Sequence, residues 1–148
     1  MILSQTAVYA LKAAIHLAEA EGPEPVRVDD IAAALGVPRN YLSKILHVLA
    51  RAGVLTSMRG PNGGFRLTRD PGVVFLADVI APFKDLTASS ACFMGRERCS
   101  DATPCAAHSR WKGIHASLRD FLNDTTVDDL SRSGAGLAGI PEASVGRA

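Results

Sequence analysis

Apolar residues recur every three or four positions through the first third of the chain. This spacing places them on one helical face, and it predicts helices over residues 4–20 and 28–35 and a third that begins at Pro38. Gly36 ends the second helix, and Gly53 closes the third in a C-cap position. The clearest apolar faces consist of Val8, Leu11, Ile15 and Ala18 in the first helix and Leu42, Ile45, Leu46 and Leu49 in the third.

The pattern changes after Gly53. Two short β-like runs, VLTS and FRLT, flank RGPNGG, whose Gly, Pro and Asn residues are turn formers. This arrangement predicts a β-hairpin. A short helix, a Gly-containing turn, a second helix and a Gly-rich hairpin are typical of a winged helix–turn–helix, in which the second helix enters the DNA major groove. The predicted fold class is therefore mainly α.

Two further helices are predicted in the second half. Residues 74–83 form the first, and Thr103 and Pro104 suit the N-cap and first position of a long last helix that runs to about residue 124. The apolar stripe of that last helix consists of Trp111, Ile114, Leu118, Phe121 and Leu122. The predicted organisation is a DNA-binding domain over residues 1–84, a cysteine loop over 85–106, a dimerisation helix over 107–130, and a disordered tail rich in Gly, Ser and Ala over 131–148.

The composition is that of an ordinary soluble protein of 148 residues, 47% of them hydrophobic. No run approaches the 18 or so apolar residues that span a bilayer, and the N-terminus lacks the basic start of a signal peptide. We therefore expect a cytoplasmic protein with reduced thiols and no membrane partner.

Basic residues cluster locally although the net charge is only +1. The stretch from residue 39 to 69 contains no Asp or Glu, and its basic residues are Arg39, Lys44, Arg51, Arg59, Arg66 and Arg69. A block of one sign over a helix–turn–helix and its wing indicates binding to the phosphates of double-stranded DNA. A winged helix that instead meets a protein partner is the alternative, and it would show no salt-dependent DNA affinity.

The predicted DNA contacts lie at the start of the third helix and in the wing. Arg to guanine and Asn to adenine are standard pairings, and an Arg in the wing can enter a minor groove. Tyr41 can equally pack its ring against the core. The predicted DNA-binding residues are Arg39, Asn40, Tyr41, Ser43, Lys44, Arg59, Gly60, Gly63 and Gly64.

All three cysteines of the chain fall in residues 92–108, which also end in a histidine. Cys92, Cys99, Cys105 and His108 follow the spacing C-x6-C-x5-C-x2-H. Structural disulfides suit neither an odd count nor a reducing compartment, although a reversible redox bridge stays possible. No nucleophile motif surrounds any of the cysteines, so we expect no enzyme.

A metal centre suits this donor set better. Three thiolates and one imidazole can hold zinc, but the tight C-x2-C turn of structural zinc sites is absent. An iron–sulfur cluster is wider than one ion and is held mainly by thiolates, so it fits ligands that have six and five residues between them. In the predicted last helix, Cys105 lies in the first turn, where the helix dipole stabilises a thiolate, and shares a face with His108.

Residues 26–70, VRVDDIAAALGVPRNYLSKILHVLARAGVLTSMRGPNGGFRLTRD, resemble the DNA-binding segment of the Rrf-type transcription regulators, which include an iron–sulfur assembly repressor and a nitric-oxide-sensing repressor. The most specific fragments are NYLSKIL and RGPNGGF, and the resemblance extends over residues 1 to about 125. It implies a homodimer of winged-helix subunits, each of which reads half of a pseudo-palindromic operator.

The resemblance also implies that Cys92, Cys99 and Cys105 hold an iron–sulfur cluster. The assembly repressor uses a histidine after the third cysteine, which matches His108, whereas nitric-oxide sensors take an acid from the first helix. Residues 1–18 contain no Asp or Glu, so His108 is the better candidate, and one nitrogen ligand favours [2Fe-2S] over [4Fe-4S]. The expected function is a cluster-based sensor of redox, iron–sulfur or nitric-oxide status. The alternatives are a metal-free thiol-based regulator of the same fold and a zinc-binding winged-helix protein.

Overall fold

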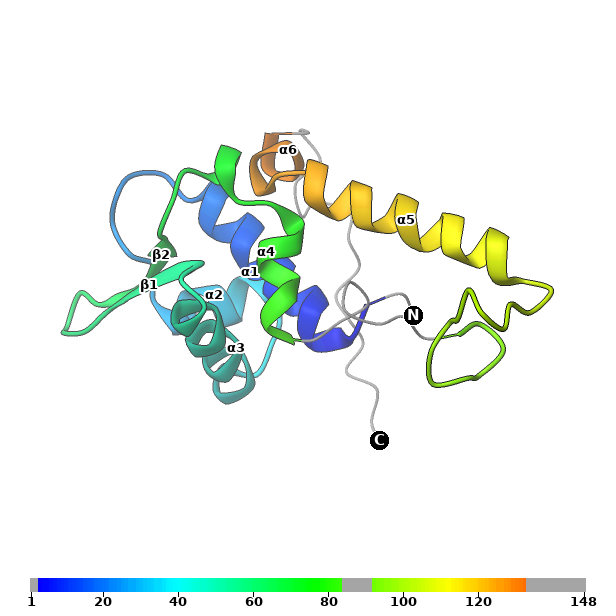
Figure 1. The fold of residues 1–148 in the computed structure, drawn as a ribbon. Helices are drawn as coiled ribbons and strands as arrows, with labels where there is room; N and C mark the ends of the chain where they lie inside the picture. Colours follow the sequence, from blue (N-terminus) through cyan, green and yellow to red (C-terminus); the bar gives the residue numbers. More distant parts are fainter. Residues whose placement is uncertain (1–2, 84–91, 133–148) are drawn as a thin grey trace.

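Helix α1 (Gln5–Glu19) is the centre of the fold. The computed structural model describes residues 3–83 and 92–132. The Ser4 side chain caps α1 by accepting a hydrogen bond from the Ala7 amide at 3.2 Å. Helix α1 contacts helices from both halves of the chain, and Figure 1 shows α4 and α6 beside it.

The helix–turn–helix predicted from the sequence is present. Helix α2 (Val28–Leu35) ends at Gly36, which adopts the left-handed conformation at φ 63° that favours glycine at a C-cap. Helix α3 (Arg39–Arg51) follows directly. Leu42, Leu46 and Leu49 of α3 are fully buried against α1 and α2. Each such leucine contributes about 1.5–3 kcal/mol by burial, which fixes the orientation of α3.

The predicted hairpin forms the wing. Strands β1 (Leu55–Met58) and β2 (Gly64–Leu67) pair antiparallel, with Leu55 opposite Leu67 and Met58 opposite Gly64. A further antiparallel bridge joins Val26, before α2, to Phe65 of β2. This bridge attaches the base of the wing to the helix–turn–helix, while the turn extends away from the body (Figure 1).

The helix predicted over residues 74–83 is shorter than expected. A 3-10 turn (Pro71–Val73) precedes helix α4 (Leu76–Ile80), and a second 3-10 turn (Ala81–Phe83) follows it. Pro82 lacks the amide hydrogen that a continuing α-helix needs, which explains the change of helix type.

The predicted last helix starts later than expected and ends at the expected residue. Helix α5 (His108–Asp124) starts later than the expected Thr103–Pro104 cap, and a separate helix α6 (Val127–Arg132) follows it. Thr126 and Asp129 cap α6 reciprocally: the Thr126 amide donates to the Asp129 carboxylate at 2.8 Å, and the Asp129 amide donates to Thr126 Oγ1 at 3.1 Å. The range 107–130 expected for one dimerisation helix thus contains α5 and most of α6, and residues 131 and 132 of the expected tail belong to α6.

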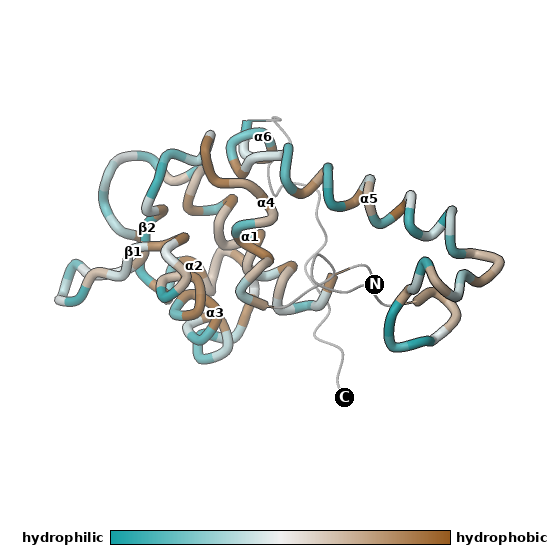
Figure 2. Tube along the Cα trace, viewed as in Figure 1, coloured by the Kyte–Doolittle hydropathy of each residue, from teal (hydrophilic) through white to brown (hydrophobic). Residues whose placement is uncertain are grey.

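Helix α5 projects from the helical body like an arm, and the cysteine loop lies at its far end (Figure 1). The apolar residues concentrate in the body, whereas the turn of the wing is hydrophilic (Figure 2). The first part of the predicted cysteine loop and the tail from residue 133 onward lie outside the described residues. Among the helices of the described ranges, none has the length and apolar character needed to cross a bilayer.

Candidate functional site

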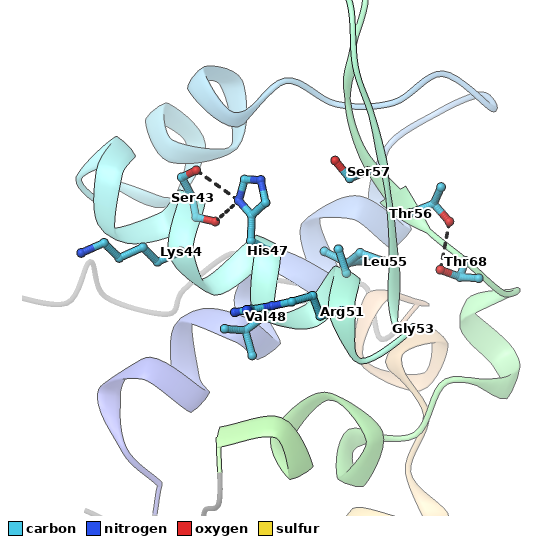
Figure 3. A pocket seen from close by; sticks show the side chains of 11 residues that line it. Ser43, Lys44, His47, Val48, Arg51, Gly53, Leu55, Thr56, Ser57 and Thr68 are labelled. Carbon is cyan, nitrogen blue, oxygen red and sulfur yellow. Dashed lines mark hydrogen bonds between the residues drawn. The ribbon is translucent and has the colours of Figure 1, made fainter.

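The exposed face of α3 and the wing enclose an open groove of about 970 Å³. Lys44, His47 and Arg51 line it from α3, and Ser57 lines it from β1 (Figure 3). Arg39 and Asn40, at the start of α3, are also exposed, and Ser43 is half-buried beside them. Most of the predicted helix contacts therefore share one accessible, basic surface next to the wing.

His47 is a groove residue that the sequence interpretation missed. Its Nδ1 atom donates a hydrogen bond to the Ser43 carbonyl at 2.7 Å, and its ring packs edge-on against Phe65 at 5.3 Å between centroids. These contacts leave Nε2 as the ring nitrogen that can meet a ligand. Asn40, Lys44, His47 and Arg51 recur at helical spacing and form one polar stripe, so this periodicity is the sequence signal that could have identified His47.

Tyr41 faces the protein more than the groove. Its hydroxyl lies 2.5 Å from the Thr6 hydroxyl, and its ring packs edge-on against Tyr9 with centroids 5.8 Å apart. Of the two roles open to Tyr41, the structure provides partners for packing. These contacts tie the start of α3 to α1.

The wing residues divide into exposed and internal ones. Arg59 and Gly60 are exposed at the turn, and Gly60 has a φ of 112°, a conformation that suits glycine. A Cβ added at Gly63 would lie 2.3 Å from the Met58 carbonyl oxygen, and one at Gly64 would lie 2.2 Å from that of Val26. The packing of the hairpin on itself and on Val26 therefore requires both glycines.

Ion pairs modify the predicted basic block. Arg39 Nε lies 2.5 Å from Asp29 Oδ1, and an Arg69 nitrogen lies 3.6 Å from Asp78 Oδ2. Both pairs are largely exposed, so each contributes only about 0–1 kcal/mol. Arg39 stays on the accessible side, where it lines a hollow of about 360 Å³ with Arg27 and Arg59.

The four predicted metal ligands lie together. Cys99 Sγ is 3.2 Å from His108 Nδ1, and the Cys92 thiol is in hydrogen-bonding contact with both Cys99 and Cys105. Cys92 and His108 are buried, although the loop around them is exposed. The loop thus folds so that residues up to thirteen positions apart in sequence meet.

The surroundings of Cys92 and Cys99 shift the pKa values of their thiols in opposite directions. Backbone amides at Met94 and Arg96 donate to Cys92 and lower its pKa. Desolvation raises the pKa of Cys99, and the neighbouring thiols Cys92 and Cys105 raise it further. Cys92 is therefore the easier of the two to convert to a thiolate.

His108 uses both ring nitrogens. Its Nε2 atom lies 2.8 Å from Asp101 Oδ1, and Lys112 Nζ binds the same carboxylate at 2.9 and 3.1 Å. The Lys112 ammonium, followed by His108, lowers the pKa of Asp101. His108 is therefore not the surface residue that its position at a helix start suggests, and Asp101 is a site residue that the sequence interpretation missed.

The helix-dipole argument for Cys105 is wrong. Cys105 precedes α5, and its carbonyl accepts a hydrogen bond from the His108 amide at 3.0 Å. Cys105 and His108 thus meet across a turn instead of along one helix face. Arg96 stabilises the turn region by donating to the Thr103 carbonyl at 2.7 Å, which leaves residues 103–107 outside the helix.

The donor set fits a cluster in its chemistry. Within residues 3–83 and 92–132, no three His, Cys, Asp or Glu side chains are grouped in a way that holds one metal ion. The donors instead meet pairwise, in the order His108, Cys99, Cys92 and Cys105. Three thiols and one imidazole in contact are the ligand types of an iron–sulfur cluster, which distributes its ligands over more than one iron.

The Rrf2 family, described as iron-dependent transcriptional regulators, matches residues 3–133. The chain belongs to this family. Members are transcription regulators that bind DNA, which agrees with the basic groove and gives no support for an enzyme. The confirmed resemblance covers the winged helix and the thiol loop in one match.

Individual relatives carry two different names. The regulator IscR of Vibrio vulnificus is 32% identical over 130 residues, which cover 88% of this chain and 77% of the relative. The structure of IscR from T. potens aligns with a TM-score of 0.70 at 27% identity, over 88% of this chain and 85% of that one. The structure of CymR, the global cysteine regulator of B. subtilis, aligns with a TM-score of 0.76 at 25% identity, over 88% of this chain and 96% of that one.

Proposed function

We propose that this Rrf2-family regulator senses redox, iron–sulfur or nitric-oxide status through an iron–sulfur cluster held by Cys92, Cys99, Cys105 and His108. The observation that carries the proposal is the series of pairwise contacts that joins the buried His108 imidazole to Cys99, Cys99 to Cys92, and Cys92 to Cys105 at the N-terminal end of α5. Thiolates with one nitrogen ligand suit a [2Fe-2S] cluster better than [4Fe-4S].

The protein-derived part of the mechanism lies in the loop and α5. A bound cluster supplies redox chemistry and a geometry that the thiols must match. Cys105 and His108 are joined by a backbone hydrogen bond at the start of α5, so a change in their spacing acts directly on that helix. Differential DNA affinity of the two states is what the mechanism requires.

A homodimer completes the proposal. Ile114 is 58% exposed and Phe121 is 53% exposed on α5, and the helix buries only His108 and Leu122 within one chain. Exposed apolar side chains on a projecting helix favour packing against a second copy. Two copies then present two α3 helices to the halves of a pseudo-palindromic operator.

The accessible polar and basic residues of α3 and the wing are proposed to contact that operator. Arg39, Asn40, Ser43 and Lys44 contact the major groove, and Arg59 with Gly60 approaches the minor groove. Gly63 and Gly64 shape the wing, and Tyr41 orients α3.

Anaerobic purification tests the cluster. We expect a coloured protein with iron and sulfide in comparable amounts, and Cys99→Ser should bleach it, whereas Ser100→Ala, the matched change one residue away, should not. A colourless protein with stoichiometric zinc contradicts the proposal.

A metal-free thiol regulator is the second candidate, and the contacts of Cys99 favour it. Cys99 touches both His108 and Cys92, so an oxidant such as a peroxide can take two electrons while two protons leave and a Cys92–Cys99 disulfide forms. The oxidized form of Staphylococcus aureus CymR has a structure that aligns with this chain at a TM-score of 0.70. A colourless, metal-free protein whose DNA binding changes with peroxide would establish this alternative.

A further inference from the structure

Asp101 bridges the cysteine loop and α5. One carboxylate oxygen lies 2.8 Å from His108 Nε2, and Lys112 Nζ lies 2.9 and 3.1 Å from the two oxygens. His108 and Lys112 are four residues apart, so they stand on the same face of α5. The carboxylate of a loop residue is thereby held at two points along the first turns of a helix.

This arrangement decides which nitrogen of His108 carries the hydrogen. A carboxylate next to an ammonium accepts and cannot donate, so Nε2 must be the donor toward Asp101. The lone pair of the neutral ring is then on Nδ1, which lies 3.2 Å from Cys99 Sγ. Asp101, which contacts Nε2, therefore determines that Nδ1 presents its lone pair to the thiols.

We propose that Asp101 is a positioning residue that fixes the orientation and tautomer of His108, so that Nδ1 is the atom presented to the thiols and to a bound cluster. The part that concerns a cluster rests on the proposed function. A histidine ligand whose second nitrogen donates to a carboxylate is held in one orientation and is a stronger base. Lys112 holds the carboxylate and acts through Asp101.

The burial of the three groups supports this division of roles. The His108 side chain is 10% exposed, whereas those of Asp101 and Lys112 are 74% and 63% exposed. An exposed pair adds little to folding stability. Substitutions at Asp101 and Lys112 should therefore leave the fold intact and act on His108 alone.

The first experiment uses the full-length, cluster-free protein with ¹⁵N-labelled histidine. NMR of the wild type should show His108 with its hydrogen on Nε2, and Asp101→Ala should produce a mixture of the two tautomers. Glu97→Gln, which removes an exposed acid from the same loop, should leave the tautomer unchanged. An unaltered His108 tautomer in Asp101→Ala would overturn the proposal whether or not the protein binds a cluster.

The second experiment uses the reconstituted protein and measures cluster loss to an iron chelator. Asp101→Ala should lose its visible absorption roughly tenfold faster than the wild type. Lys112→Met should show a smaller acceleration, and Glu97→Gln none. Equal rates in Asp101→Ala and the wild type would overturn the cluster part of the proposal.

Pulsed EPR of the reduced protein, labelled with ¹⁵N at histidine Nδ1 alone in one sample and at Nε2 alone in another, identifies the coordinating atom. Coupling to Nδ1 supports the proposal, and coupling to Nε2 or to no histidine nitrogen overturns it. A wild type that takes up no iron or sulfide refutes the proposed function, while the NMR experiment still tests Asp101 as the residue that positions His108.

Discussion

The Sγ atom of Cys99 lies 3.2 Å from Nδ1 of His108, at the N-terminal end of the arm formed by α5. Cys99 is also in contact with Cys92, so the two thiols whose pKa values shift in opposite directions are neighbours. Cys99 therefore connects the ionisation of the loop thiols to His108, the first residue of α5.

The two shifts predict an order of thiol ionisation in the cluster-free protein. A lowered pKa means that the thiolate forms at lower pH, so Cys92 should ionise before Cys99 as the pH rises. NMR of the cysteine Cβ carbons across pH 6–10 measures both in one sample. Simultaneous ionisation of Cys92 and Cys99 would show that the loop amides do not stabilise the Cys92 thiolate in solution.

Arg59→Ala should weaken operator binding. Arg59 is exposed at the turn of the wing, and loss of one guanidinium contact with DNA costs roughly 1–3 kcal/mol. The measurement is a binding titration at several salt concentrations, in which a lost phosphate contact also lowers the salt dependence by about one unit.

Arg119→Ala is the control, because Arg119 is equally exposed but lies on α5, away from the groove. Equal affinities of Arg59→Ala and the wild type at physiological salt would remove the wing from the DNA interface.

Gly64→Ala should destabilise the winged helix. A Cβ at this position would lie 2.2 Å from the Val26 carbonyl oxygen, and overpacking of this kind costs typically ~1–3 kcal/mol. Urea unfolding measures the change in the free energy of unfolding.

Gly113→Ala is the matched control for that prediction. Gly113 lies within α5, and an added Cβ meets nothing within 4 Å, so alanine should raise helix stability by about 0.5–1 kcal/mol. A Gly64→Ala protein as stable as the wild type would mean that the base of the wing shifts freely.

Ile114→Asp should dissociate the proposed dimer. Ile114 is 58% exposed in the single chain, so a charge there harms the monomer little but opposes burial against a second copy. Sedimentation should show the dissociation constant raised more than tenfold, about 1.4 kcal/mol or more.

Ala116→Asp places the same charge about 200° around α5 and should leave the dimer intact. If both variants remain dimeric at the same concentration as the wild type, the dimer interface lies elsewhere.

The winged helix could be predicted because its signals are local. Gly36 and Gly53 punctuate the helices, the leucines of α3 follow the helical period, and the Pro, Asn and Gly residues of the wing turn lie between two β-like runs. Each of these features determines the local structure of a few residues, and the tertiary contacts favour the same local structure.

The region after residue 100 was harder to predict because competing contacts decide it. Thr103 and Pro104 have the pattern of a helix start, but the Thr103 carbonyl accepts from Arg96, and α5 begins only at His108. The end of α5 had a readable signal, since Thr126 followed by Asp129 is a capping pattern. The pairing of Asp101 with His108 has no such pattern, because it depends on how the loop closes.

The hydrophobic core of the protein is separate from the cysteine loop. The contiguous hydrophobic core draws on α1, α2, α3, the wing, α4, Leu122 and Val127, and no described residue between 92 and 108 contributes to it. At 1.5 Å per residue, the seventeen residues of α5 set the loop about 25 Å from the opposite end of that helix. Chemical change in the cysteine loop should therefore leave the winged helix folded. Under the proposed function, the cluster could be lost and rebuilt while the hydrophobic core stays intact.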